Sequence, residues 1–215
     1  MIDSDDYLPD DISIEYLMEA AKGYDILQGN HVTTDPEGNA VSESKFEGLS
    51  GFAWGKIYHY SVFDHFRFPE GYWFEDTPVK FIISAMGLKI RNLNKCVYCH
   101  RRNPEGISSR ALNQRKSVDT YWITEQCLQE LPAFGIEYDQ DSFNHLLHQS
   151  IINMIRTRKQ PRRIRKALFI LTAELVEKYF PNQKSIVYSE IENAIRNKQF
   201  FKYELSAIAE WCNRK

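Results

Sequence analysis

The hydrophobic pattern of the first part of the chain alternates between helical and extended periods. Apolar residues within 14–21 recur at the spacing of one helix face, so this segment is expected to form a helix. Asp10 or Asp11 is expected to cap its start, and Gly23 is expected to end it. The stretch YDILQGNHV at 24–32 then indicates a short strand.

Two further elements complete this mixed region. The turn sequence DPEG at 35–38 leads into a second extended piece, and KIRNLNKCVYCHRR at 89–102 predicts one or two strands. Between them, 75–87 predicts a helix with Asp76 or Thr77 as its cap, a proline in its first turn and a glycine at its end. Strand and helix signals are therefore interleaved up to about residue 112.

From about residue 117 the pattern becomes helical throughout. Apolar residues recur at helical spacing in five successive segments, and prolines separate the first four of them. The segments are 118–131, 142–158, 163–180, 186–197 and 199–213, and the prolines are Pro132, Pro161 and Pro181. The fold class predicted is therefore an α/β region over 1–112 followed by an all-helical region over 113–215.

Composition and charge narrow the class of protein. A chain of 215 residues, 43% of them hydrophobic, is long enough for one or two domains. Four scattered cysteines do not make a disulfide framework and no apolar run could span a membrane, so we expect a cytoplasmic protein, free or at the inner face of the membrane.

The two ends of the chain differ in charge. Residues 1–50 hold twelve Asp and Glu against two Lys and Arg, a net charge of −10; because the whole chain carries −2, the rest carries +8. The acidic end is a candidate for binding a cation and the basic end for binding phosphate, although either excess of charge is also typical of a solvent-exposed face.

The densest acidic cluster is the opening sequence, MIDSDDYLPDD. Carboxylates this close repel one another unless a cation or several hydrogen-bond donors lie between them. An EF-hand loop is excluded because Tyr7 stands where a ligand is needed and Leu8 where a glycine is needed. Asp3, Asp5 and Asp6 therefore indicate an Asp-x-Asp arrangement at the end of a strand, where carboxylates hold a divalent ion that binds a diphosphate.

Four blocks in a fixed order make this arrangement more specific. They are IDSDDYLPDDISIEYLMEAAKGYDILQGN, WGKIY, RFPEGYWFED and VYCHRRNPEGISS. Together they resemble the family 2 glycosyltransferases, inverting enzymes of the GT-A fold that build bacterial surface polysaccharides. The resemblance covers residues 2 to about 112 and implies a partial GT-A sheet. The helical region behind it is similar to the variable C-terminal part of bacterial members.

The resemblance implies roles for individual residues. Asp5, with Asp3 or Asp6, would hold Mn²⁺ or Mg²⁺, and His100 is a candidate third ligand. Asp76 would be the general base that takes a proton from the acceptor hydroxyl; without the resemblance it would be interpreted as a helix cap. The implied substrate-binding residues are Trp54, Lys56, Trp73 and Glu75 on the acceptor side and Arg101 at a phosphate, although each could also be ordinary packing. The implied substrates are a nucleotide-sugar donor and a glycan or lipid-linked acceptor.

The chain departs from the family where the nucleotide is bound. In the family, a strand of Pro-Val-Tyr-Asn type and an Asp-Asp-Gly-Ser block precede the Asp-x-Asp stretch, and neither occurs here. Met1 and Ile2 resemble the end of the strand that carries the acidic cluster. We therefore interpret the chain as the C-terminal portion of a metal-dependent glycosyltransferase. Alone, it is expected to be inactive or to need the nucleotide-binding half from another polypeptide.

Two other motifs carry weaker alternatives. Cys96 and Cys99 match a haem-attachment or half-zinc spacing, but an offset of three along a strand predicts sulfurs on opposite faces, so neither metal nor haem is expected there. The run RTRKQPRRIRK at 156–166 holds seven basic residues in eleven. A solvated helix junction is the first interpretation and peripheral membrane contact the second; nucleic acid is not expected as a partner because the run lacks aromatic residues for base stacking.

The competing function is a non-catalytic binding module that docks a partner or a membrane surface through the helical region. The sequence leaves open the donor sugar, the acceptor, the choice between Mn²⁺ and Mg²⁺, and the oligomeric state.

Overall fold

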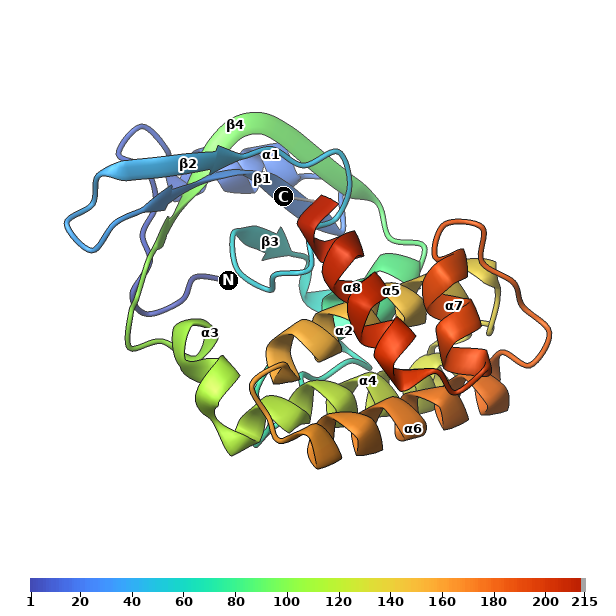
Figure 1. Ribbon diagram of the computed structural model, residues 1–215. Helices are drawn as coiled ribbons and strands as arrows, with labels where there is room; N and C mark the ends of the chain where they lie inside the picture. The colour runs from blue at the N-terminus through green and yellow to red at the C-terminus, as the bar shows by residue number, and fades with distance from the viewer. Residues whose placement is uncertain (214–215) are drawn as a thin grey trace. The chain divides into compact units, whose positions relative to one another are not determined.

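The computed structural model describes residues 1–213, apart from the side chains of Ser108 and Asn113, and these residues divide into two units (Figure 1). The first unit contains residues 1–68 and 76–109, and the second contains 69–75 and the chain from 110 onward. The first is mixed α/β and the second is helical, as the hydrophobic pattern predicts. The hydrophobic pattern did not predict that the short segment 69–75 belongs to the helical unit.

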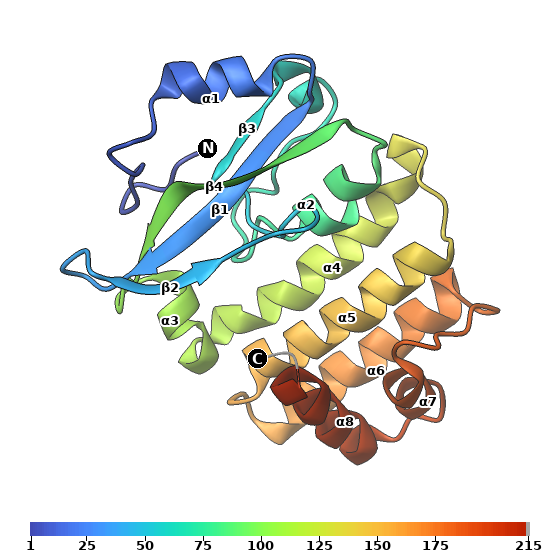
Figure 2. The same ribbon diagram turned by 90° about the horizontal axis from the view of Figure 1, so that it is seen from above.

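The first unit is built on a four-stranded sheet with β1 at its centre. Its strands are β1 Ile26–Thr34, β2 Ala40–Ser44, β3 Lys56–Tyr58 and β4 Ile90–Arg101. β4 runs parallel to β1 (Figure 2). β2 pairs antiparallel with the C-terminal half of β1, and β3 pairs antiparallel with its N-terminal half. The predicted strands at 24–32, after 35–38 and at 89–102 are confirmed, the last as a single strand.

The register of β4 against β1 slips twice. One slip lies between Gly29 and Asn30, and the other between Asn30 and His31. Val97 is unpaired at the second slip, and its methyl groups lie so close to Gly29 that an added Cβ would be 2.6 Å from Val97 Cγ1. Glycine is therefore required at position 29 by the close approach of the bulged strand. An odd slip also exchanges the faces on which the following side chains lie.

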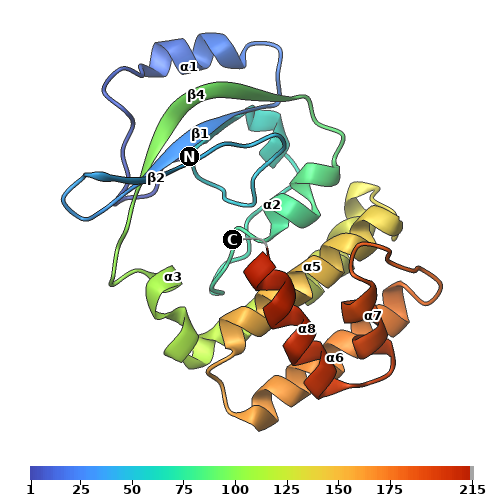
Figure 3. The same ribbon diagram turned by 45° about the horizontal axis from the view of Figure 1, so that its top comes forward.

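Helix α1 (Ile14–Ala21) covers one face of the sheet (Figure 3). Its inward side joins a core of buried residues, which are Ile12, Leu17, Leu27, Val97 and Tyr98. The predicted helix is confirmed, but the prediction of Asp10 or Asp11 as its cap is wrong. Ser13 directly precedes the first helical residue, and its hydroxyl accepts a hydrogen bond from the backbone N–H three residues later at 3.1 Å.

The helix predicted over 75–87 is shorter than expected. Helix α2 covers only Pro78–Phe81 and is followed by a 3-10 turn at Ile83–Ala85. The proline lies in the first turn as predicted, and Thr77 is the cap residue by position, but its side chain makes no capping hydrogen bond.

Five helices make up most of the second unit, and they confirm the five predicted segments. They are α4 Asp119–Glu130, α5 Gln140–Thr157, α6 Arg162–Tyr179, α7 Ser189–Arg196 and α8 Phe200–Asn213. α4, α5 and α6 run side by side, and α7 and α8 pack against each other and against α6 and α5 (Figure 2). The short helix α3 (Ile107–Arg110) precedes them. Single 3-10 turns occur at Tyr60–Phe63, Ala111–Asn113, Arg115–Val118 and Leu131–Phe134.

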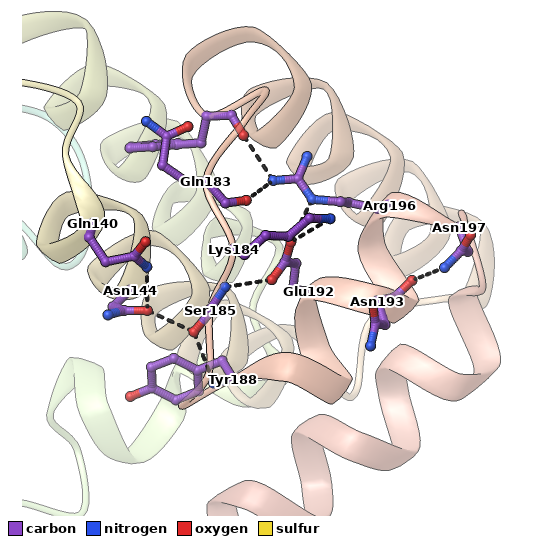
Figure 4. A network of polar contacts seen from close by, with 11 residues as sticks. Gln140, Asn144, Gln183, Lys184, Ser185, Tyr188, Glu192, Asn193, Arg196 and Asn197 are labelled. Carbon is purple, nitrogen blue, oxygen red and sulfur yellow. Dashed lines mark hydrogen bonds and ion pairs between the residues drawn. The ribbon is translucent and has the colours of Figure 1, made fainter.

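A buried carboxylate fixes α7 within the helical unit (Figure 4). Glu192 accepts hydrogen bonds from the Ser185 N–H at 2.6 Å and from Arg196 Nε at 2.7 Å. Arg196 also donates to the carbonyls of Phe180 and Gln183. Burial opposes ionisation, but these donors outweigh it and hold the pKa of Glu192 below its ordinary value. The network ties α7 to the chain that leaves α6.

The segment 69–75 is held by side chains of the helical unit. Asp119 Oδ2 accepts a hydrogen bond from the Trp73 N–H at 3.0 Å. Phe74 has a φ of 66°, in the left-handed region that residues other than glycine rarely adopt. The guanidinium of Arg156 lies 3.8 Å from the centre of the Phe74 ring and helps to hold this conformation.

Candidate functional site

The acidic N-terminal loop is fastened to the end of β4. Tyr7 and Cys99 exchange backbone hydrogen bonds of 3.2 and 2.8 Å. One carboxylate oxygen of Asp6 accepts from the Arg101 N–H at 2.8 Å, and the other accepts from the Tyr98 hydroxyl at 2.6 Å. Burial and the hydrogen bond to this carboxylate raise the pKa of Tyr98, so its hydroxyl remains a donor. Asp6 is thus an anchor of the loop as well as a candidate ligand.

The other two carboxylates of the loop lie at the same edge of the sheet. Asp3 and Asp5 are exposed. The Asp3 N–H donates to the Tyr98 hydroxyl at 3.0 Å, and Asp5 Oδ2 accepts from the Asn103 side-chain amide at 2.8 Å. The parallel strands β1 and β4 both end here, and ligands of α/β sheets commonly bind at the carboxyl ends of parallel strands. The guanidinium of Arg101 is also here, 5.2 Å from the centre of the Tyr7 ring.

An aromatic stack adjoins the acidic loop. The Trp54 indole lies parallel to the rings of Phe52, Tyr98 and His100, with centroids 4.4, 4.8 and 5.0 Å away. Two predicted residues, Trp54 and His100, are therefore brought together, and Tyr98 connects them to Asp6. The Trp54 indole therefore packs against three rings of the protein itself. Its predicted stacking against an acceptor sugar stays a prediction.

His31 belongs to the same stack and was missed by sequence reasoning. It is 6% exposed, stacks on Phe46 at 5.4 Å and meets Trp54 edge-on at 5.0 Å. Within residues 1–213 its Nδ1 has no hydrogen-bond partner. Burial, together with the positive charges of His100 and Lys56, lowers the pKa of His31 to about 4, so the ring is neutral at pH 7. The available signal was a histidine in the predicted strand YDILQGNHV, which also holds Asp25, Gln28 and Asn30.

Lys56 is an internal residue of the first unit. It is 3% exposed, and its Nζ donates to Ser50 Oγ at 2.7 Å and to the Phe52 carbonyl. Burial lowers the pKa of Lys56 to about 7, against the opposing effect of the negative charge of Asp76. The ammonium group therefore clamps loop 50–54 from within. Contact between Lys56 and an acceptor stays a prediction.

Asp76 is half-buried beside this lysine at the start of α2. Its charge raises the pKa of Lys56, and it adds to burial in raising the pKa of Tyr58. Its backbone carbonyl accepts a hydrogen bond from the Val79 N–H at 2.9 Å. Because the cap position of α2 belongs to Thr77, capping alone does not explain the carboxylate of Asp76.

The predicted site residues fall into two groups in the sheet unit and one pair in the helical unit. Loop 50–56 joins the two groups of the sheet unit, because it carries Trp54 at the acidic loop and Lys56 at Asp76. Trp73 and Glu75 belong to the helical unit, and the boundary between the units passes between Glu75 and Asp76. The ring of Trp73 lies 5.9 Å from the Nζ of Lys116, also in the helical unit.

The described side chains do not complete a metal site by themselves. Within residues 1–213, no group of three or more His, Cys, Asp or Glu is arranged to hold an ion. Both carboxylate oxygens of Asp6 and one of Asp5 already accept hydrogen bonds. The acidic loop therefore fits Mg²⁺ or Mn²⁺ only together with phosphate oxygens of a bound substrate, which is the usual mode for Mg²⁺.

The predicted geometry of the two neighbouring cysteines of β4 is wrong. Cys96 pairs with Asn30 and Cys99 pairs with Val32, and residues two apart on β1 share a face. The unpaired Val97 causes this by shifting the alternation of β4 by one. Burial and the neighbouring Cys96 raise the pKa of Cys99, and both thiols are free. That they bind neither metal nor haem stays a prediction.

Comparisons with family models, with curated proteins and with solved structures found no match for this chain. Among the helices of residues 1–213, none is long and apolar enough to cross a membrane. The resemblance to family 2 glycosyltransferases therefore rests on the sequence motifs.

Proposed function

We propose that this chain is the C-terminal portion of a metal-dependent, inverting family 2 glycosyltransferase. The parent enzyme would transfer a sugar from a nucleotide-diphosphate donor to a glycan or lipid-linked acceptor in surface polysaccharide synthesis. The observation that carries the proposal is the hydrogen bond between Asp6 and the Arg101 N–H, which are 95 residues apart. It joins the Asp-x-Asp block to the VYCHRRNPEGISS block at the carboxyl end of β4, so two motifs named from sequence alone meet at one edge.

The acidic loop supports binding of a diphosphate together with a cation. Asp5 is exposed and Asp6 is held in place by two donors, so one carboxylate is available and the other keeps the loop fixed. The exposed Arg101 side chain offers a guanidinium for a phosphate oxygen. A divalent ion bound by Asp5 and the diphosphate would offset the negative charge that develops on the leaving group.

In the proposed reaction, the acceptor hydroxyl oxygen attacks the anomeric carbon of the donor sugar. The bond from that carbon to the phosphate oxygen breaks, and the nucleoside diphosphate leaves with the electron pair. Asp76 takes the proton of the attacking hydroxyl. Asp76 and Lys56 interact electrostatically, since the negative charge of Asp76 raises the pKa of Lys56.

Binding of inorganic pyrophosphate with Mn²⁺ tests the diphosphate site without the nucleotide-binding half. Paramagnetic Mn²⁺ broadens the NMR signals of amides close to it. With both reagents present, we expect broadening at Asp5, Asp6 and Arg101, and little with either alone, because the protein supplies too few ligands. Asp5→Asn should remove this broadening. Glu37→Gln, which changes another exposed carboxylate of the same unit, should leave it unchanged.

Diffuse broadening, or broadening that survives Asp5→Asn, would refute the acidic loop as the diphosphate site. The 215-residue chain alone is expected to show no turnover of a sugar nucleotide, and measurable turnover would refute its assignment as a portion of the catalytic domain. The competing function, a binding module that docks through its helical region, is supported by a separate feature, the exposed apolar side chains of α8.

A further inference from the structure

Helix α8 carries apolar side chains on its outer side as well as its inner side. Phe201, Leu205 and Ile208 are 68%, 54% and 47% exposed. Their spacings of four and three residues place them along one line of the helix, which we call the α8 stripe. Scattered exposed apolar residues are ordinary, but an aligned set on one helix indicates a contact surface.

The basic run at 156–166 is only partly used inside the protein. Arg156 donates to Thr120 Oγ1 at 3.0 Å, and Arg165 forms an ion pair with Glu204. The other five basic residues are exposed, and we call them the basic cluster: Arg158, Lys159, Arg162, Arg163 and Lys166. The internal contacts account for Arg156 and Arg165, whereas the five exposed charges remain available to a partner outside the chain.

The basic cluster and the α8 stripe adjoin one another. The ion pair between Arg165 and Glu204 joins the first turn of α6 to the first half of α8. Lys166 follows Arg165 in the chain and Leu205 follows Glu204, so an exposed member of each set flanks this pair. The Arg165 guanidinium also lies 6.0 Å from the centre of the Phe200 ring, beneath the stripe. Both sets lie within the helical unit.

We propose that the basic cluster and the α8 stripe form a docking surface for a bilayer that contains anionic lipids. Such a bilayer presents negative headgroups above an apolar boundary, and the two sets match these two layers. Long Lys and Arg side chains reach headgroups while Phe, Leu and Ile side chains enter the boundary. No spanning helix is involved. The proposal is independent of sugar transfer and holds for a catalytic or a non-catalytic chain.

Other occupants fit the surface less well. A nucleic acid would use the cations and could stack on Phe201, but Leu205 and Ile208 offer it neither a hydrogen bond nor a stacking face. A second copy of this chain would cover the stripe, but a two-fold contact would also bring two basic clusters together, and their like charges would repel. An anionic lipid surface is complementary to both parts at once.

Co-sedimentation of the full chain with lipid vesicles tests the proposal. Vesicles of phosphatidylcholine and phosphatidylglycerol at about 3:1 are compared with vesicles of phosphatidylcholine alone. We expect binding to the anionic vesicles only, weakened by high salt. Leu205→Ser with Ile208→Ser should weaken binding by on the order of tenfold through lost apolar contact. Arg158→Glu with Lys159→Glu should weaken it by on the order of tenfold or more.

Matched control variants lie elsewhere on the surface. Ile186→Ser changes an apolar side chain that is 95% exposed before α7, and Lys45→Glu with Lys89→Glu reverses two exposed charges of the sheet unit. Both should bind as the unchanged chain does, and circular dichroism checks that every variant is folded.

Three outcomes would overturn the proposal. The first is an absence of binding to anionic vesicles. The second is a loss of binding in the charge variants alone, with the stripe variant unaffected, since this would reveal unspecific attraction such as a nucleic acid also gives. The third is a dimer in light scattering that the stripe variant dissociates, without vesicle binding, since the stripe would then be a contact between copies.

Discussion

Protonation of His31 is expected to limit the stability of the sheet unit at mildly acidic pH. The ring is 6% exposed and enclosed by Phe46 and Trp54, and its Nδ1 has no hydrogen-bond partner in residues 1–213. An imidazolium in this place would lose its hydration without gaining an acceptor. Burial first, and then the charges of His100 and Lys56, lower the pKa of His31 to about 4.

The magnitude follows from the difference in proton binding between the folded and unfolded chains. The ordinary pKa of 6.5 applies to the unfolded chain, so between pH 6.5 and about 4 the unfolded chain binds a proton that the folded chain does not. Each pH unit in this window costs about 1.4 kcal/mol, and the whole window costs about 3 kcal/mol. The free energy of unfolding is undiminished by His31 above pH 6.5, and this cost accumulates as the pH falls to about 4.

The variant His31→Phe isolates this effect, because phenylalanine keeps the ring stack and cannot take up a proton. Urea unfolding between pH 7 and pH 4 is followed by hydrogen exchange of the β1 amides, because these amides report on the sheet unit that contains His31. The stability of the variant relative to the unchanged chain should rise by about 3 kcal/mol as the pH falls. Carboxylates that titrate alike in both proteins cancel in this difference. A difference that does not change with pH would refute the enclosure of His31.

Gly29→Ala should lower the free energy of unfolding by about 1–3 kcal/mol, because its Cβ would lie 2.6 Å from Val97 Cγ1; a change below about 0.5 kcal/mol in urea unfolding would contradict the bulge. Asp76→Asn should lower the pKa of Lys56 further below about 7 and Lys80→Met should raise it, because Asp76 raises and Lys80 lowers that pKa. Lysine NMR titration measures both shifts. An unchanged pKa of Lys56 in Asp76→Asn would show that the charge of Asp76 does not act on Lys56. In an enzyme completed with a nucleotide-binding half, Asp76→Asn should slow transfer by a factor on the order of 10² with donor affinity nearly unchanged; close to full activity would place the base elsewhere, with Glu75 the next candidate. In the same enzyme, Asp5→Asn should abolish metal-dependent activity with little change in Tm, and retained activity at saturating donor would refute its role.

Most elements of the fold could be predicted because they depend on local patterns. The five helices of the second unit follow an apolar period, with prolines between the first four of them, and β1 follows the strand signal of YDILQGNHV. The segment 75–87 was predicted less well because Phe81, Ile82 and Ile83 are all at most 3% exposed. Three successive residues of a regular helix cannot all lie at the centre of one buried face. The chain therefore leaves the α conformation after Phe81, and tertiary packing overrides the helical pattern.

The faces of β4 could not be predicted, because they depend on a bulge. Counting along a regular strand placed Cys96 and Cys99 on opposite faces, and one unpaired residue, Val97, reverses that result. The sequence does contain a sign of the bulge, but it lies 68 positions earlier, at Gly29 on the neighbouring strand. A glycine that makes room for a distant side chain cannot be recognised before the pairing of the strands is known.

The site shows the same division between local motifs and distant contacts. The motifs named Asp3, Asp5, Asp6, His100 and Arg101, and the structure brings these residues to one edge of the sheet. The motifs gave no indication that Lys56 is buried or that His31 is enclosed, because burial of a polar residue depends on its neighbours in space. Lysine is among the residues most often exposed, so assigning Lys56 to the acceptor side was the natural interpretation of the sequence.

Lys56 also lies between the two groups of the sheet unit and interacts with both. Its ammonium group holds Ser50 and the Phe52 carbonyl, and the same loop carries Trp54 against His100 at the acidic edge. On its other side, Lys56 interacts with the charge of Asp76. A neutral Lys56 would have one N–H donor fewer for loop 50–54, and it would no longer offset the negative charge of Asp76. One buried ammonium group therefore interacts both with the segment that carries Trp54 and with Asp76, and its pKa, about 7, lies where small changes in its surroundings alter its charge.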